Sequence, residues 1–167
     1  TPAAQTGGNR HGPVAGANGG SGAEAAAKLD GVAKVLVADD ASYEKQLAEP
    51  MAALVTSMAD GYATIATPAS TNGKNFMPRI AALLDCSQIS DITAVIDSQT
   101  FERPIYAGNA IQTVRTGETC KAVTIRSTAF AAAGDGGSAA VEAAGTADNP
   151  GISEFISEEL TKSDRPE

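Results

Sequence analysis

The segment from Tyr62 to Asp85 constrains the fold most, because a strand, a loop and a helix follow one another in it. Residues 63–67 form a short apolar run with β-branched members at alternate places, which favours a strand. Small polar residues then predict a loop. The helical pattern comes next, with Pro78 in its first turn, where a missing N–H costs least. Its apolar face has the spacing i, i+4, i+7 and i+8 and consists of Phe76, Ile80, Leu83 and Leu84.

The loop of this unit has the composition of an anion-binding loop. A helix N-terminus presents unpaired backbone N–H groups and the positive end of the helix dipole. Ser70, Thr71 and Lys74 add two hydroxyl groups and a cation at this point. We therefore identify these three residues as candidates for binding phosphate or carboxylate. Strand-to-helix loops in α/β domains have this composition in any case, so an ordinary loop is the competing interpretation.

Helices and strands alternate before this unit. The alanine-rich residues 24–29 predict a short helix, and residues 33–38 predict a buried strand. A longer helix follows, with Pro50 in its first turn. This alternation predicts a parallel sheet. The apolar positions of the longer helix are Leu47, Met51, Leu54, Val55 and Met58.

The pattern changes after Asp85. Residues 92–96 predict one more strand, and three further strands follow it with no helix between them. Turns at 108–109 and 116–117 join these three, so we expect them to be antiparallel. Pro104 cannot donate to a ladder, which places its strand at an edge or at a bulge. The three strands are expected at residues 101–106, 110–115 and 122–126.

The two ends of the chain have weaker patterns. Residues 1–21 contain six glycines and two prolines and predict a flexible loop, since residues 8–14 are too polar and too broken for a central strand. His11, the single histidine, is expected on the surface of this loop. Residues 129–149 have no clear period, and residues 154–160 predict a last short helix.

Charge and hydropathy exclude several classes of protein. The net charge of −8 and the pI near 4.6 provide no basic surface for nucleic acid or for an anionic membrane. No apolar run approaches the ~18 residues of a membrane span. The chain does not open with a charged and then apolar leader. We therefore expect a soluble, unexported protein without membrane insertion.

Motifs for catalysis and metal binding are missing from the sequence. Gly73 and Lys74 lack the earlier glycine and the later Ser or Thr of a P-loop. A single histidine in a loop excludes a Ser–His–Asp set. Cys86 and Cys120 do not form a CxxC pair and predict two reduced thiols. We therefore expect no active site of the chain's own and no metal.

Residues 101–110 carry a resemblance to a known family. Their sequence, Phe-Glu-Arg-Pro-Ile-Tyr-Ala-Gly-Asn-Ala, is similar to a segment in the amino-terminal domain of the electron transfer flavoprotein alpha subunit. Other segments fit the same family in the same order, and the resemblance spans residues 31–167. These segments are residues 32–38, 73–79, 89–91, 124–126 and 163–167.

The resemblance implies a three-layer α/β domain. It would be Rossmann-like, similar to the adenine-nucleotide hydrolases, with a mainly parallel sheet flanked by helices and an antiparallel hairpin extension. Residues 1–160 would form this domain, and residues 161–167 would begin a linker. The family opens with a strand ahead of its first helix, and we expect the chain to start beyond that strand.

The resemblance also implies an electron carrier. The alpha subunit pairs with a beta subunit, accepts electrons from acyl-CoA and related dehydrogenases in fatty acid β-oxidation, and passes them to a membrane quinone oxidoreductase. FAD carries the electrons and is held mainly by a carboxy-terminal domain, which would follow residues 161–167. We therefore expect no flavin on this chain. The compartment would be the cytoplasm of a bacterium, or the mitochondrial matrix of a eukaryote.

For this chain, the resemblance implies a non-catalytic scaffold that docks the beta subunit and supports the flavin domain. The competing interpretation of the contact candidates is structural: solvated charges, a core tyrosine and a turn asparagine. A different functional class, a stand-alone domain that binds AMP or ATP through residues 70–74, is the alternative. The candidates for contacts with a partner or a neighbouring domain are Lys74, Arg79, Arg103, Tyr106 and Asn109.

Overall fold

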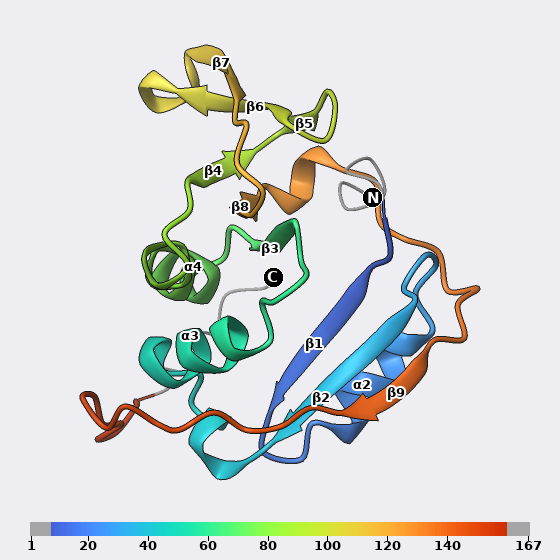
Figure 1. Ribbon diagram of the computed structural model, residues 1–167, viewed down its shortest axis with the longest axis vertical. Coiled ribbons are helices and arrows are strands. Elements are labelled where there is room, and N and C mark those ends of the chain that lie inside the picture. The colour runs from blue at the N-terminus through green and yellow to red at the C-terminus, as the bar shows by residue number, and fades with distance from the viewer. Residues whose placement is uncertain (1–7, 160–167) are drawn as a thin grey trace.

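The computed structural model describes residues 8–159, and the expected linker and the expectations for residues 1–7 lie outside this range. Strands and helices alternate up to residue 92, and the described residues after it form strands and 3-10 turns (Figure 1). The helices are α2 (Gly20–Ala27), α3 (Ala48–Ser57) and α4 (Thr71–Leu83), with single 3-10 turns η1 (Ala41–Tyr43), η2 (Tyr106–Gly108) and η3 (Ser127–Ala129). The strands are β1 (His11–Gly16), β2 (Lys34–Asp39), β3 (Thr64–Pro68), β4 (Gln88–Ile92), β5 (Ala94–Val95), β6 (Thr100–Ile105), β7 (Ala110–Arg115), β8 (Lys121–Ile125) and β9 (Ala140–Ala143).

Parallel strands dominate the architecture, which confirms the expected α/β class. They form two three-stranded sheets, in the orders β1-β2-β9 and β3-β8-β4. The third sheet, β5-β6-β7, is antiparallel and lies at one end of the molecule, beyond β4 and β8 (Figure 1). Helix α2 packs on the first sheet, and α4 packs on α3 and on the second sheet. The arrangement is consistent with a Rossmann-like three-layer domain.

Helix α4 begins earlier than its sequence pattern predicts. Ser70 is its N-cap and accepts a hydrogen bond from the Gly73 N–H at 3.2 Å. The helix therefore starts inside the segment expected to be a loop, because the hydroxyl of Ser70 satisfies one of the free N–H groups of the first turn. The expectation that Pro78 lies in the first turn is wrong, since it lies in the helix interior.

Three of the four residues predicted for the buried face of α4 are right, because Ile80 is buried and Phe76 and Leu84 pack against the core. Leu83 is 61% exposed, which contradicts its assignment to the core face. The glycine on the true face lets the helix approach β3 closely, because a Cβ on Gly73 would lie 2.1 Å from the carbonyl oxygen of Pro68. The buried residues of the helix are Gly73, Met77, Ile80 and Ala81.

The strand predictions after Asp85 are partly right. Strands β6 and β7 form the expected antiparallel hairpin. Pro104 pairs with Ile111 of β7, and the short strand β5 pairs only with Phe101 and Glu102, so β6 has no β5 partner at Pro104. The strand expected at 92–96 divides into β4 and β5. The antiparallel assignment of 122–126 is wrong, because β8 lies between β3 and β4 and is parallel to both. Apolar side chains on both faces of β8 suit this central, doubly covered position.

The weakly patterned ends contain more order than expected. Residues 11–16 form β1 rather than a flexible loop, at the edge of its sheet, where Pro13 is tolerated. Residues 140–143 add β9 beside β2. The expected last helix is not observed, since residues 154–159 are irregular, and two side chains at or near this segment contact other elements. Ser153 donates to the Glu49 carboxylate at 2.7 Å, and Glu158 pairs with Lys45 at 3.3 Å.

Candidate functional site

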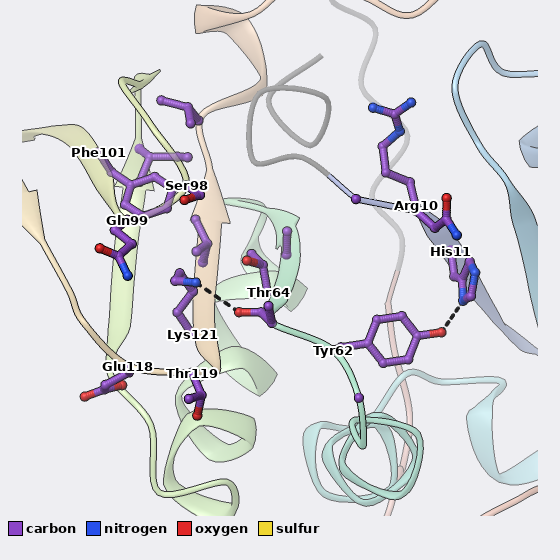
Figure 2. A pocket seen from close by; sticks show the side chains of 18 of the residues that line it. Arg10, His11, Tyr62, Thr64, Ser98, Gln99, Phe101, Glu118, Thr119 and Lys121 are labelled. Carbon is purple, nitrogen blue, oxygen red and sulfur yellow. Dashed lines mark hydrogen bonds between the residues drawn. The ribbon is translucent and has the colours of Figure 1, made fainter.

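A cavity of about 920 Å³ lies between the start of β1, β3 and the antiparallel sheet (Figure 2). His11 lines it rather than lying on a free surface, and its Nδ1 is hydrogen-bonded to the Tyr62 hydroxyl. Lys121 is 5% exposed, and its ammonium donates to the Ala63 carbonyl at 3.1 Å. The guanidinium of Arg10 also donates to a backbone carbonyl.

These contacts bear on whether the cavity could hold FAD, the cofactor that the family resemblance implies. Each of the two lining cations, Arg10 and Lys121, donates a hydrogen bond to a backbone carbonyl. The carboxylates of Asp60 and Glu118 add negative charge to the lining. A pyrophosphate needs free cations or helix N-terminal N–H groups. Since the two cations are matched by two carboxylates and the described lining includes no start of a helix, the cavity suits a pyrophosphate poorly.

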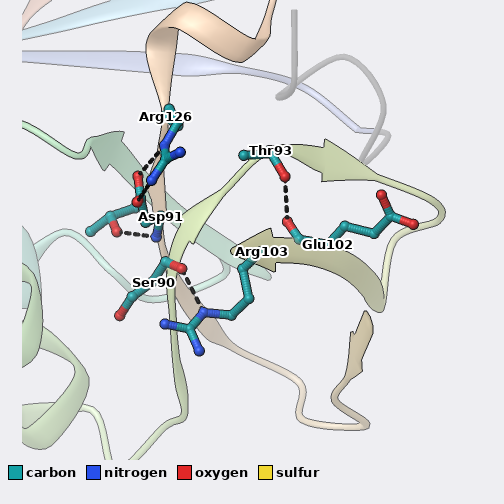
Figure 3. A network of polar contacts seen from close by, with 7 residues as sticks. Ser90, Asp91, Thr93, Glu102, Arg103 and Arg126 are labelled. Carbon is teal, nitrogen blue, oxygen red and sulfur yellow. Dashed lines mark hydrogen bonds and ion pairs between the residues drawn. The ribbon is translucent and has the colours of Figure 1, made fainter. Parts of the chain in front are cut away.

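A second polar group lies where β4, β6 and β8 meet, and Figure 3 shows it. We call Ser90, Asp91, Arg103 and Arg126 the Asp91 network. Asp91 lies at an irregularity of the β4–β8 pairing, with a positive φ of 59°. Asp and Asn tolerate this conformation better than other non-glycine residues. Its backbone N–H donates to the hydroxyl of the buried Thr124 at 2.7 Å.

Charge holds the network together. The Arg126 guanidinium donates two hydrogen bonds to the Asp91 carboxylate. These bonds lower the pKa of Asp91, and the charges of Arg126, Lys74 and Arg103 lower it further, against a smaller opposing effect of burial. Asp91 is thus a carboxylate stabilised in its charged form by neighbouring cations.

Arg103 connects the network to the antiparallel sheet. From β6, its Nε donates to the Ser90 carbonyl at 2.8 Å, and its Nη1 lies 3.4 Å from the Gln112 side-chain oxygen on β7. Arg103, which lies on β6, therefore contacts both β4 and β7. We infer that Arg103 fixes the orientation of the hairpin relative to the parallel sheet.

The other predicted contact residues are dispersed. Lys74 lies near the network, since its charge lowers the pKa of Asp91. Arg79 lies elsewhere and pairs with Glu49 of α3 at 2.8 Å. Tyr106 is 83% exposed at the hairpin tip, so it is not a core residue, and Asn109 follows it in the same tight turn.

The predicted anion loop forms the start of α4. The Ser70 hydroxyl oxygen is occupied by the Gly73 N–H, while Thr71 and Lys74 are exposed. The Lys74 N–H donates to the Ser70 carbonyl at 2.9 Å. Two of the first-turn N–H groups, those of Gly73 and Lys74, thus have Ser70 as their partner.

Sequence reasoning did not select Asp91, Ser90 and Arg126 as site residues. Residues 89–91 and 124–126 had a signal, because both are among the segments that resemble the family. The pairing of β4 with β8 brings those segments together, and this pairing was not predicted. The positive φ of Asp91 is likewise a property of the folded chain.

Two broader properties of residues 8–159 bear on function. Their helices lack the combination of length and apolar character needed to span a bilayer. In the same residues, His, Cys, Asp and Glu side chains do not gather in threes or more with a geometry that could hold a metal ion.

Comparison with known proteins extends these observations. The family model of the electron transfer flavoprotein domain matches residues 1–149. The chain is 54% identical to electron transfer flavoprotein subunit alpha of Paracoccus denitrificans over 153 residues, which are 92% of this chain and 50% of the relative. It is also 54% identical to the Pseudomonas aeruginosa protein of the same name over 162 residues, 96% of this chain and 52% of the relative.

A eukaryotic relative is similar over the same part. The mitochondrial electron transfer flavoprotein subunit alpha of Dictyostelium discoideum is 45% identical over 170 aligned residues, covering 92% of this chain and 48% of the relative. The chain thus spans about half the length of the curated relatives that it matches. The chain belongs to the electron transfer flavoprotein family and is similar to its alpha subunit.

Proposed function

We propose that this chain is the scaffold part of an electron transfer flavoprotein alpha subunit and that it docks the beta subunit through the antiparallel sheet. In this role it carries no catalytic group. The assembled flavoprotein accepts electrons from acyl-CoA and related dehydrogenases and passes them to a quinone oxidoreductase. FAD is held by other parts of the assembly, in agreement with the poor fit of the cavity to a pyrophosphate.

The exposed hairpin is the observation that carries this proposal. Tyr106 and Ile111 are 83% and 58% exposed, and both belong to the hairpin of β6 and β7. Ile96, at the other end of β6, is 59% exposed. Large apolar and aromatic side chains grouped on a projecting element are typical of protein interfaces. Arg103 supports the same role, because it fixes the hairpin on the parallel sheet.

A double variant, Tyr106→Asn with Ile111→Thr, tests the docking surface. Asn suits the positive φ of 51° at position 106, and Thr keeps a β-branched side chain in β7. Sedimentation velocity with purified beta subunit should show at least ~10-fold weaker association, as expected for loss of a central aromatic contact.

A matched control separates docking from general loss of apolar surface. Leu83→Asn removes a side chain that is 61% exposed on α4, far along the chain from the hairpin. This variant should associate like the parent chain. Equal affinity of the double variant and the parent would remove the hairpin from the interface.

The alternative function is binding of AMP or ATP at the start of α4. The exposed Thr71 and Lys74 beside a helix N-terminus favour it. Isothermal calorimetry with AMP and with ATP distinguishes the two functions. Binding heat that disappears in Lys74→Ala would support the nucleotide site, whereas no heat and no shift in melting temperature would exclude it.

A further inference from the structure

The two cysteines of the chain lie at the same end of neighbouring parallel strands. Cys86 lies two residues before the start of β4, and Cys120 directly precedes β8. Both are free thiols with part-buried side chains. We propose that Cys86 and Cys120 form a reversible disulfide bond that joins the starts of β4 and β8 in the parallel sheet. The proposal does not depend on the docking role.

The register of the strands places the two residues opposite each other. Gln88 pairs with Ala122, and Ile89 pairs with Val123. Counting back two residues on each strand puts Cys86 beside Cys120. The Ala122 N–H donates to the Ser87 carbonyl at 3.1 Å, so the ladder continues to this point. Adjacent strands lie about 4.8 Å apart, which is within the Cα separation of about 4.4–6.8 Å that disulfides require.

Two hydrogen bonds also join the segment that contains Cys86 to the segment that contains Cys120. The Glu118 carboxylate accepts hydrogen bonds from both the backbone N–H and the hydroxyl of Ser87, each at 2.6 Å. The residue after Cys86 is thus tied to a residue two before Cys120. Closure of the bond therefore needs little additional ordering of the chain.

The environments of the two thiols differ. Cys86 packs against the core cluster that contains Ala52, Met77 and Ile80. Burial raises the pKa of its thiol, and the adjacent Cys120 raises it further. Since the thiolate is the attacking species, the core-packed Cys86 is the poorer initial nucleophile. We assign the first attack to Cys120 and the resolving step to Cys86.

The oxidant in this proposal is a low-molecular-weight disulfide such as glutathione disulfide. The Cys120 thiolate attacks one sulfur of the oxidant, whose S–S bond breaks and releases one glutathione thiolate. The Cys86 thiolate then attacks the protein sulfur of the mixed disulfide and releases the second glutathione. Two electrons pass from the cysteine pair to the oxidant, and the two thiol protons go to solvent or to the released thiolates.

The bond would close a loop that contains all of β4, β5, β6 and β7. Its two ends lie where the chain enters the parallel sheet, before β4 and before β8. Oxidation would therefore restrain the movement of the whole loop, while the exposed hairpin itself would form no new covalent bond.

Mass spectrometry of the chain in glutathione redox buffers tests the proposal. After acid quenching and alkylation with N-ethylmaleimide, the oxidised chain should carry no alkyl group and should weigh ~2 Da less than the reduced, unalkylated chain, since two hydrogen atoms are lost. Trypsin should then release peptides 80–115 and 116–121 joined by a disulfide, because Pro104 protects the bond after Arg103 from cleavage.

Single variants provide the matched controls. Cys86→Ser should accumulate one glutathionyl group on Cys120, because the resolving thiol is missing, while Cys120→Ser should react more slowly. Two alkyl groups on the parent chain at every glutathione ratio would overturn the proposal. Glutathionyl groups on both cysteines, or disulfide-linked dimers on a non-reducing gel, would overturn it as well.

Discussion

Strands β7 and β8 have similar compositions and opposite environments. The segment Ala-Ile-Gln-Thr-Val-Arg of β7 is exposed along almost its whole length, whereas the first four residues of Lys-Ala-Val-Thr-Ile in β8 are buried. Strand β8 is buried because it lies between two parallel neighbours, and β7 has a neighbour on one side only. The two strands have similar strand propensity, and position in the sheet decides which strand is buried and which is exposed.

Phe101 joins these two regions. It lies on β6 of the antiparallel sheet, has no exposed surface, and packs against Ile89, Ile92 and Val123 of the parallel sheet. The exposed extension is thus anchored in the core of the second sheet. The following predictions test this division between a buried parallel sheet and a projecting antiparallel one.

The largest effect is expected from Phe101→Ala. Loss of the ring leaves a cavity at the junction of the two sheets, and we expect the free energy of unfolding to fall by ~3–5 kcal/mol. Urea denaturation followed by circular dichroism measures it. Tyr106→Asn is the aromatic control, since its ring is exposed and should change stability by no more than ~0.5 kcal/mol. Equal effects would show that the anchor is unimportant.

Substitution of Gly73 by Ala is the next test. Ala normally stabilises a helix relative to Gly by ~1 kcal/mol. Here its Cβ would lie 2.1 Å from the Pro68 carbonyl oxygen, so we expect a loss of ~1–3 kcal/mol in thermal or urea unfolding. Gly117→Ala is the matched control, because nothing lies within 4 Å of its Cβ position. A stabilised Gly73→Ala chain would contradict the close packing of α4 on β3.

Val123→Ala and Ile111→Ala compare the two strands directly. The first removes two methyl groups from a side chain that is 1% exposed, and we expect a loss of about 1.6 kcal/mol or somewhat more. The second removes more apolar volume from an exposed position and should change stability by less than ~0.5 kcal/mol. Chemical denaturation of both variants in parallel measures the difference. A reversed order would mean that β7 is covered and β8 is not.

Asp91→Asn should have a small effect, below ~1 kcal/mol, because its ion pair with Arg126 is partly exposed. Asn keeps the side-chain shape and tolerates the positive φ, so the variant isolates the charge. The lowered pKa of Asp91 means that its contribution is present above the unfolded-state pKa and is lost as pH falls through the lower folded-state pKa.

Unfolding free energies of parent and Asp91→Asn chains, measured from neutral to acidic pH, test that sign. The difference between them should shrink below about pH 4, the usual range of aspartate. Asp97→Asn is a suitable comparison, since that carboxylate also has a lowered pKa but its principal partners are the backbone N–H of Gln99 and the side chain of Thr100. A difference for Asp91→Asn that persists into strong acid would show that charge is not its source.

Local patterns predicted most of the secondary structure correctly. The spacing of Leu47, Met51 and Leu54 marked α3, and the hairpin of β6 and β7 followed from its turn residues. The resemblance of residues 101–110 to the family suggested Arg103, Tyr106 and Asn109 as contact candidates, and this stays a prediction. The Asp91 network was not recognisable from the sequence, because Arg126 and Asp91 are distant in sequence and meet only through strand pairing.

By itself, the sequence determined the alternation of helices and strands, the acidic charge and membership of the electron transfer flavoprotein family, since these depend on residue type and local spacing. Tertiary structure alone decided that β8 lies at the centre of a parallel sheet, that α4 buries Met77 instead of Leu83, and that Cys86 lies opposite Cys120. Each of these depends on which strands pair and how closely a helix approaches them. Such contacts join residues far apart in the chain, where local periodicity contains no information.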